Sequence, residues 1–438
     1  MDTISNPRQW YPSPDREVSP RPWFLPLTWL AFIISTMLPR KTRVAIAVPA
    51  LIFLVNQVRA ISTGDNVKDF SRASFIFGFM LKFIDFGILT RDGEAYKVKD
   101  RKPSSEKAGN ISKAPSEVPI EEGKSIWGSF KDSAELWLFT LRGVGWNWEV
   151  GGIPQREPQS RRCFPPVQNT SIANISSYFL FRTIVRIFGS YLAWDICKHV
   201  MGLFPYIQST NRGSFFDEPL IDQVVLTWLH QLEAFCFINL PYQIGALLTV
   251  ATGVQTPPDW PPLFGAFSDG YLVSRAWGRV WHQLLRKPLS ILTPHVQRWL
   301  GTTSRGSKRT VSLLCSFTMS GFVHWSGALN CPWTPSSHGM FTYFIMQAPV
   351  VRLEDYIVDW GRQKGVKSSS KLKNLLKRKD LLTGILAFLK CFGYIWTVSW
   401  ISFSMRYAAR YQFEHGALSV HEPFKTSFID YLVAKIKA

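Results

Sequence analysis

The chain has 438 residues, of which 46% are hydrophobic, 14% are aromatic and only 18% are charged. It carries 50 lysines and arginines against 31 acidic residues, which gives a formal net charge of +19. The apolar residues come in blocks, and the basic residues lie mostly in the loops between them. This arrangement argues against soluble domains and against a nucleic-acid partner, and it is typical of an integral membrane protein.

The apolar blocks, taken in chain order, predict a helical membrane bundle. The first 22 residues are polar and proline-rich, and the first apolar run lacks a clear small-residue cleavage site, so we expect a retained span there. Crossing a bilayer takes about 20 mainly apolar residues. The stretches that come near this length are 23–38, 44–61, 73–90, 178–197, 224–252, 310–329, 340–351 and 381–405. We therefore predict an all-α polytopic protein with about eight transmembrane helices, in which 340–351 is tilted or re-entrant.

The loops predict how this bundle is oriented. Residues 275–309 and residues 362–379 each contain many basic residues and no acidic residue, which places both loops on the cytosolic side. Two spans lie between them, so the assignment is self-consistent. Residues 91–140 are polar and predict a largely disordered loop within a single membrane-embedded domain, 1–438.

The stretch "SGFVHWSGAL" places His324 inside an apolar segment. An ionisable group in a span is costly and usually lines a functional path, but a packed histidine bonded to a carbonyl is an equally good reading. Its small neighbours Ser320, Gly321 and Gly327 leave room for a close helix or for a ligand. If it is functional, a neutral imidazole some 20 Å from the cytosolic end of its span can accept a proton from an alcohol near pH 7.

The stretch "SRAWGRVWHQLLRKP", residues 274–288, mixes tryptophans with basic residues. Trp277 and Trp281 are four residues apart and would share a face of a helix. One reading is an amphipathic helix at the membrane surface, and the other is a cytosolic site for a ligand that carries phosphates. In the second reading His282 and Gln283 lie at the polar edge.

Two further patterns give little support to a reactive or metal-binding site. His230 and Glu233 are three residues apart in a predicted span, where a structural pair is favoured over a proton relay or half of a metal site. The six cysteines include no C-x-x-C pair, so we expect neither a zinc site nor a disulfide framework.

Together these residues resemble a known family. A Trp-x-x-x-Trp-His-Gln segment in a basic loop, followed about 40 residues later by Ser-Gly-x-x-His, is similar to the wax synthase-like branch of the membrane-bound O-acyltransferases. The stretch "LRGVGWNWEV", residues 141–150, resembles a segment of fungal members, which often acetylate terpenoid or meroterpenoid alcohols. The resemblance is specific over 260–350 and 141–153. Ala276 and Val280 depart from the residues that the family usually has there.

The resemblance implies a function and a site. It implies transfer of an acetyl group from acetyl-CoA, an acyl-CoA co-substrate, to a hydrophobic alcohol, with no bound cofactor and no metal. His324 would be the catalytic base, and His282 or Gln283 would donate to the oxyanion. The implied ligand-binding residues are Trp277, Trp281, Gln283, Arg275 and Arg279, with the two arginines holding CoA phosphates. It also implies a multi-pass protein among the lipids of the endoplasmic reticulum membrane.

Other functions remain open from the residues alone. One alternative within the same class is a wax ester synthase that joins a long-chain acyl-CoA to a fatty alcohol. A proton-coupled transporter that uses His230, Glu233 and His324 is an alternative of another class, although no repeat of two halves is visible. A third is a non-catalytic scaffold that binds lipid through its basic loops.

Overall fold

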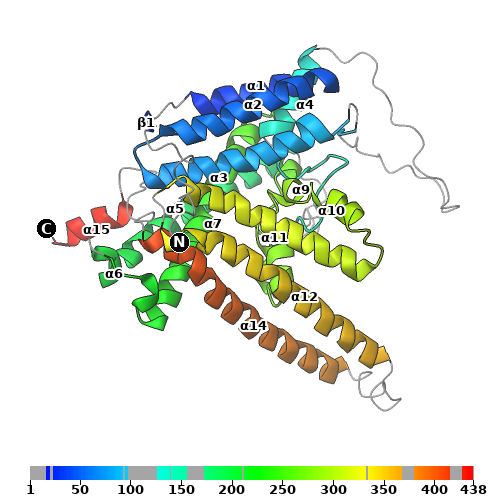
Figure 1. Ribbon diagram of the computed structural model, residues 1–438. Helices are drawn as coiled ribbons and strands as arrows, with labels where there is room; N and C mark the ends of the chain where they lie inside the picture. Colours follow the sequence, from blue (N-terminus) through cyan, green and yellow to red (C-terminus); the bar gives the residue numbers. More distant parts are fainter. Residues whose placement is uncertain are drawn as a thin grey trace, which may run out of the picture.

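A computed structural model describes most of the chain and shows a helical bundle (Figure 1). The described residues are 16–19, 23–91, 94–96, 126–138, 140–154, 172–209, 212–331, 334–366, 379–414 and 427–437. Within these ranges the strands are limited to one short parallel pair, β1 (Glu17–Val18) and β2 (Ile61–Ser62). The predicted all-α class is therefore confirmed.

The long helices coincide with the predicted apolar stretches. They are α1 (Phe24–Thr36), α2 (Arg40–Ala60), α3 (Asn66–Phe83), α5 (Ile172–Gly202), α7 (Leu220–Ala251), α11 (Arg305–Leu329), α12 (Gly339–Val366) and α14 (Lys379–Glu414). The shorter helices are α4 (Ile126–Leu138), α6 (Pro205–Gln208), α8 (Val273–Arg275), α9 (Arg286–Leu289), α10 (Thr293–Trp299) and α15 (Phe428–Lys437). The π-helices are η2 (Ile84–Leu89) and η6 (Ala276–Val280), and the 3-10 turns are η3 (Phe215–Asp217), η4 (Pro257–Asp259), η5 (Phe267–Asp269) and η7 (Pro335–His338).

Two expectations about these elements need correction. The stretch 340–351 is not a short or re-entrant piece, because it forms the first half of the 28-residue helix α12, whose second half is rich in charged residues. In the loop expected at 91–140, residues 126–138 form α4, which buries Leu136 and Trp137. Residues 97–125 lie outside the described ranges.

By length and composition alone, two helices in the described part of the chain are apolar enough to cross a membrane, α2 and α7. Most of the other long helices carry ionisable residues that lower their mean hydropathy. Thus α3 buries Asp69 and Lys82 in the protein, and α11 begins with Arg305, Lys308 and Arg309. A bundle interior can hold such groups because other parts of the protein satisfy them.

Local chemistry sets the ends of the helices that build the site. The carboxylate of Asp65 accepts from the backbone N–H of Val67 at 2.9 Å and begins α3. The hydroxyl of Ser304 accepts from the N–H of Ser307 at 3.0 Å and begins α11. Both caps satisfy N–H groups that have no partner within the helix.

Helix α11 lies between α3 and α12, and α14 packs on the other side of α12 (Figure 1). Small residues allow these close approaches: a side chain at Gly327 would collide with the backbone of Phe70 in α3, and one at Gly339 with the backbone of Tyr407 in α14. An ion pair between Arg309 and Asp355, 3.0 Å apart, joins α11 to α12 near the start of α11. The basic loop, the start of α11 and the charged half of α12 thus share one end of the bundle.

Candidate active site

Residues 273–289, called the motif segment below, fold into α8, η6 and α9 instead of one helix. The helical path stops at Trp281, which has extended backbone angles. The Nε2 group of Gln283 donates to the carbonyls of Trp277 (2.8 Å) and Trp281 (2.6 Å), which a continuing helix would otherwise satisfy. The expected shared helical face is therefore wrong, although the rings of Trp277 and Trp281 still contact each other edge to face, with centroids 6.4 Å apart.

A buried carboxylate from α12 holds the start of the motif segment. Glu354, only 4% exposed, accepts from the backbone N–H groups of Val273 (2.7 Å) and Ser274 (2.8 Å). It also accepts from the indole N–H of Trp396 in α14 at 2.9 Å. The first N–H groups of a helix are natural partners for an anion, so this contact fixes where the motif segment begins.

An amide one heptad earlier on α12 holds the first motif tryptophan. Gln347 is fully buried, and its Oε1 accepts from the indoles of Trp277 (3.3 Å) and Trp400 (3.0 Å). Its Nε2 donates to the Tyr343 carbonyl and to the Ser404 hydroxyl, so both ends of the amide are satisfied. The sequence analysis missed both Gln347 and Glu354. The sequence pattern that could have identified them is a pair of polar residues seven apart along an apolar helix.

His324 lies near the end of α11 and is linked to the motif segment through one aromatic ring. Its imidazole stacks on Phe344 of α12 with centroids 4.8 Å apart and an interplanar angle of 9°. The other contacts of Phe344 include Trp277, at 5.6 Å. Among the described residues no side-chain hydrogen bond occupies the His324 ring, so the reading of a histidine bonded to a carbonyl lacks support there.

His282 sits beside this arrangement in an aromatic surround. Its ring lies 5.2 Å from Trp281 and meets Phe264 edge to face at 5.9 Å. Its Nδ1 is buried and has no hydrogen-bond partner among the described residues. Removal from solvent, with smaller effects of charge on His324 and Arg142, lowers the pKa of His282 to about 3. The ring is therefore neutral at physiological pH and offers one N–H donor.

The two arginines predicted to hold CoA phosphates differ in whether their side chains already have a polar partner. Arg275 donates to the carboxylate of Asp269 at 2.9 Å and lies over the ring of Tyr271 at 4.4 Å, so its charge is already compensated. Arg279 is exposed and has no polar partner among the described residues. The geometry therefore argues against Arg275 as a phosphate ligand and leaves Arg279 available.

The other segment that carried the resemblance packs directly on the motif segment. Arg142, 3% exposed, donates to the carbonyls of Pro261 (2.7 Å) and Pro262 (2.8 Å) ahead of it. Arg286 donates in return to the carbonyl of Gly151 at 2.5 Å. The two segments, more than a hundred residues apart in sequence, thus form one unit.

The third predicted feature is structural. His230 and Glu233 pair at 3.5 Å, and the indole of Trp194 in α5 donates to Glu233 at 3.0 Å. The pair therefore joins α7 to α5, as the favoured reading predicted. Within the described ranges, no group of three or more His, Cys, Asp or Glu residues is arranged to hold a metal ion.

Comparison with known proteins identifies relatives of this chain. Residues 260–346 match the membrane bound O-acyl transferase family. The chain is 25% identical over 427 residues to the acetyltransferase sirH of Leptosphaeria maculans, covering 93% of this chain and 95% of the relative. It is also 25% identical over 394 residues to the acetyltransferase ple2 of Rhodocybe pseudopiperita (87% and 88% covered). The O-mevalon transferase yanI of Aspergillus niger is 26% identical over 364 residues (75% and 74% covered).

No solved structure gives a significant match. The family match spans the motif segment, His324 and the part of α12 that carries Phe344. The relatives extend the similarity from this match over nearly the whole chain. The protein is an enzyme, an O-acyltransferase.

Proposed function

We propose that this enzyme transfers an acetyl group from acetyl-CoA to a hydroxyl of a terpenoid or meroterpenoid alcohol within the membrane. The observation that carries the proposal is the stack of His324 on Phe344 and the contact of Phe344 with Trp277. It brings a half-buried histidine to the motif segment, which also presents Arg279. Relatives named acetyltransferase support acetyl as the transferred group.

The chemistry follows from these positions. His324 accepts the hydroxyl proton while the oxygen attacks the thioester carbonyl, so a C–O bond forms and the carbonyl oxygen becomes an oxyanion. The neutral His282 donates its N–H to that oxyanion. When the C–S bond breaks, the leaving CoA sulfur takes the proton back from His324. Both N–H groups of Gln283 are used by backbone carbonyls, so we assign Gln283 to shaping the motif segment.

The proposal includes the membrane arrangement. The long helices cross the endoplasmic reticulum membrane, and the basic loops face the cytosol, from which Arg279 binds the CoA phosphates. His324 lies nineteen residues after Arg305, roughly 28 Å along α11. The motif segment folds back into the bundle and meets it, which supports an acyl donor that enters from the cytosolic side.

A second candidate donor has its own support. Two relatives are named O-mevalon transferases: yanI, and macI of Penicillium terrestre, which is 30% identical over 262 residues. Those names favour a larger acyl group than acetyl in part of this group of proteins. No observation on the described residues favours a long-chain wax ester over either.

The test is transfer by microsomes that contain the full chain. Labelled acetyl-CoA and other acyl-CoAs are offered with a panel of terpenoid and fatty alcohols. We expect acetyl-CoA and a terpenoid alcohol to give the fastest ester formation, and His324→Ala to lower it about 10²–10⁴-fold. His295→Ala is the matched control, because His295 is exposed on α10 and its ring, among the described residues, bonds the side chain of Arg298. Turnover by His324→Ala equal to that of this control would remove the base from the mechanism.

A further inference from the structure

Arg142 is a buried cation that is held by neutral oxygens. Besides the carbonyls of Pro261 and Pro262, its guanidinium donates to the hydroxyl of Tyr242 in α7, 2.5 Å away. Among the described residues no carboxylate forms an ion pair with it. Burial lowers the pKa of the guanidinium, but an arginine stays protonated in a protein. Because a buried charge without a counter-ion is costly, this arginine points to a role other than stability.

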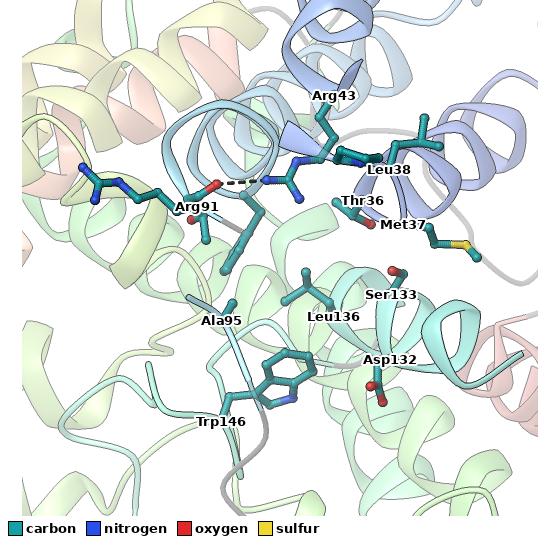
Figure 2. A pocket seen from close by; sticks show the side chains of 13 residues that line it. Thr36, Met37, Leu38, Arg43, Arg91, Ala95, Asp132, Ser133, Leu136 and Trp146 are labelled. Carbon is teal, nitrogen blue, oxygen red and sulfur yellow. Dashed lines mark hydrogen bonds between the residues drawn. The ribbon is translucent and has the colours of Figure 1, made fainter. Parts of the chain in front are cut away.

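The segment that carries Arg142 is fixed to the bundle on its other side. Its buried Trp146 packs with Leu136 of α4 and with Phe86 of η2. Figure 2 shows Trp146 and Leu136 at the wall of one cavity. The backbone N–H of Val150 donates to the carbonyl of Arg142 at 3.0 Å, which closes the segment on itself. The side chain of Arg142 therefore extends from a well-anchored base.

The two carbonyls that Arg142 binds belong to consecutive prolines ahead of the motif segment. The hydroxyl of Tyr242, which accepts from Arg142, also donates to the carbonyl of Pro261 at 2.6 Å. Each proline ring fixes its own φ, so the chain has little freedom at this point. Arg142 and Tyr242 together therefore determine where the residues after Pro262 lie.

Those next residues form a wall of the His282 site. The ring of Phe264 meets His282 edge to face, with centroids 5.9 Å apart. The N–H of Gly265 donates to the carbonyl of Val280 at 2.9 Å, and a Cβ at Gly265 would lie 2.1 Å from the carbonyl oxygen of Arg279. The stretch 260–265 thus lies directly against the backbone just before His282.

Packing alone sets the position of the His282 ring. Among the described residues no hydrogen bond holds this ring, and its buried Nδ1 lacks a partner. A group that donates to a developing oxyanion must be held within about 0.5 Å of its working position. Removal from solvent, then charge on His324 and the charge of Arg142, lower the pKa of His282. The cation of Arg142 thus also favours the neutral ring.

We propose that Arg142 is a positioning residue for acyl transfer, which holds the stretch 260–265 so that His282 can donate its N–H to the oxyanion. The inference rests on the role proposed for His282 and adds the residue that places it. Arg142 acts through the prolines and Phe264 and need not touch the substrate. The planar fork of a guanidinium can bond two successive carbonyls and a hydroxyl at once, which the single ammonium of lysine does less well.

A double-mutant cycle on the full chain tests this inference. Transfer from labelled acetyl-CoA to the alcohol that the wild type uses fastest is measured in microsomes, and each rate is divided by the amount of folded protein after solubilisation. Arg142→Lys should lower kcat about tenfold and leave the KM for acetyl-CoA unchanged, because the oxyanion contact forms only in the transition state.

The second arm of the cycle removes the group that Arg142 positions. His282→Leu should lower kcat about 10²-fold, as expected for loss of one oxyanion donor. In the His282→Leu protein, Arg142→Lys should change kcat by less than about twofold, since the donor that it positions is already gone. A purely structural arginine would lower kcat equally in both backgrounds.

Two further variants keep the test independent of how well Arg142→Lys folds. Tyr242→Phe removes one hydroxyl from the Pro261 carbonyl and should lower kcat about threefold, the worth of one neutral hydrogen bond, again only when His282 is present. Arg212→Lys is the matched control, because Arg212 also donates to three backbone carbonyls, none of them in the motif segment. It should lower the melting temperature but keep kcat of the folded protein within about twofold of the wild type.

The possible outcomes separate this inference from the function it rests on. Equal losses for Arg142→Lys with and without His282, or wild-type kcat in both Arg142→Lys and Tyr242→Phe, would overturn the inference and leave His282 in its role. A raised KM for acetyl-CoA with an unchanged kcat would also overturn it, because Arg142 would then act on donor binding. Wild-type turnover by His282→Leu would instead remove the oxyanion donor from the proposed function, and this inference with it.

Discussion

At the scale of single residues, His282 makes the free energy of unfolding depend on pH. Its folded pKa of about 3 lies below the ordinary value of 6.5 because the ring is withdrawn from water. Between these values the unfolded chain binds a proton at this ring that the folded chain does not. The free energy of unfolding therefore falls as the pH falls below about 6.5 and is fully restored above it.

Replacing this ring should make the protein less sensitive to acid. We expect His282→Gln to flatten the fall in melting temperature between pH 6.5 and pH 4.5, because glutamine binds no proton in that range. The measurement is thermal unfolding in detergent across this range. His295→Gln, on the exposed face of α10, should melt with the same pH dependence as the wild type. A profile for His282→Gln that matches the wild type would contradict the burial of this ring.

Some residues of the site were predictable from the sequence, and others were not. The spacing around His324 and the Trp-His-Gln run around His282 stand out because polar groups are rare in such surroundings. The pairing of Arg275 with Asp269 was not predicted, since Asp269 lies in a turn whose path the sequence does not reveal. Phe344 lies in an apolar run that any membrane helix would share, so nothing marks its contact with His324.

At the scale of elements, the motif segment depends on α12. Three N–H donors converge on the two oxygens of Glu354. Glutamine at this position would place an amide N–H₂ opposite one of them. We expect Glu354→Gln to cost about 2–3 kcal/mol of stability, because one donor loses a charged acceptor in a buried place.

The same change should slow acyl transfer at least about tenfold in protein that is still folded, since the motif segment loses its anchor. Melting temperature and transfer rate in microsomes measure the two effects. The matched control is Asp355→Asn, which removes the neighbouring carboxylate from an ion pair with Arg309 that is partly exposed. That control should cost less than about 1 kcal/mol and should leave transfer unchanged. Equal effects of the two changes would show that Glu354 does not position the segment.

The elements show where reasoning from the sequence stops. Hydrophobic runs in the sequence predicted the positions of the long helices, because a helix in a bundle needs an apolar face over its whole length. The break at Trp281 was not visible, because it depends on Gln283 bonding two carbonyls of the folded chain. Residues 340–351 looked short because their helix continues into charged residues outside the apolar run.

At the scale of the whole molecule, the proposed topology makes a prediction about access. A protease site inserted at Gly301, in the turn between α10 and α11, should be cut in sealed microsomes by protease added outside. A site inserted at Gly64, between β2 and α3, lies at the opposite end of the bundle and should be cut only after detergent is added. Both glycines are exposed and lie in turns, which are the places where an insertion is best tolerated.

Immunoblots of the fragments measure cleavage at each inserted site. The transfer activity of each protein that carries an insertion shows that it folds. Cleavage of the Gly64 site in sealed vesicles would invert the proposed orientation. Cleavage of both sites in sealed vesicles would place the two ends on one side and would contradict α3 and α11 as spans.

The indoles of Trp396 and Trp400 complete the anchors on Glu354 and Gln347, and both belong to α14. The ribosome makes the motif segment about 110 residues before it reaches Trp400, an interval of roughly 5–20 seconds at ordinary rates of synthesis. During that time the nascent chain holds the motif segment without the two α14 indoles that complete its anchors. We therefore expect a chain that is terminated before α14 to lack both anchors and to show no acyl transfer.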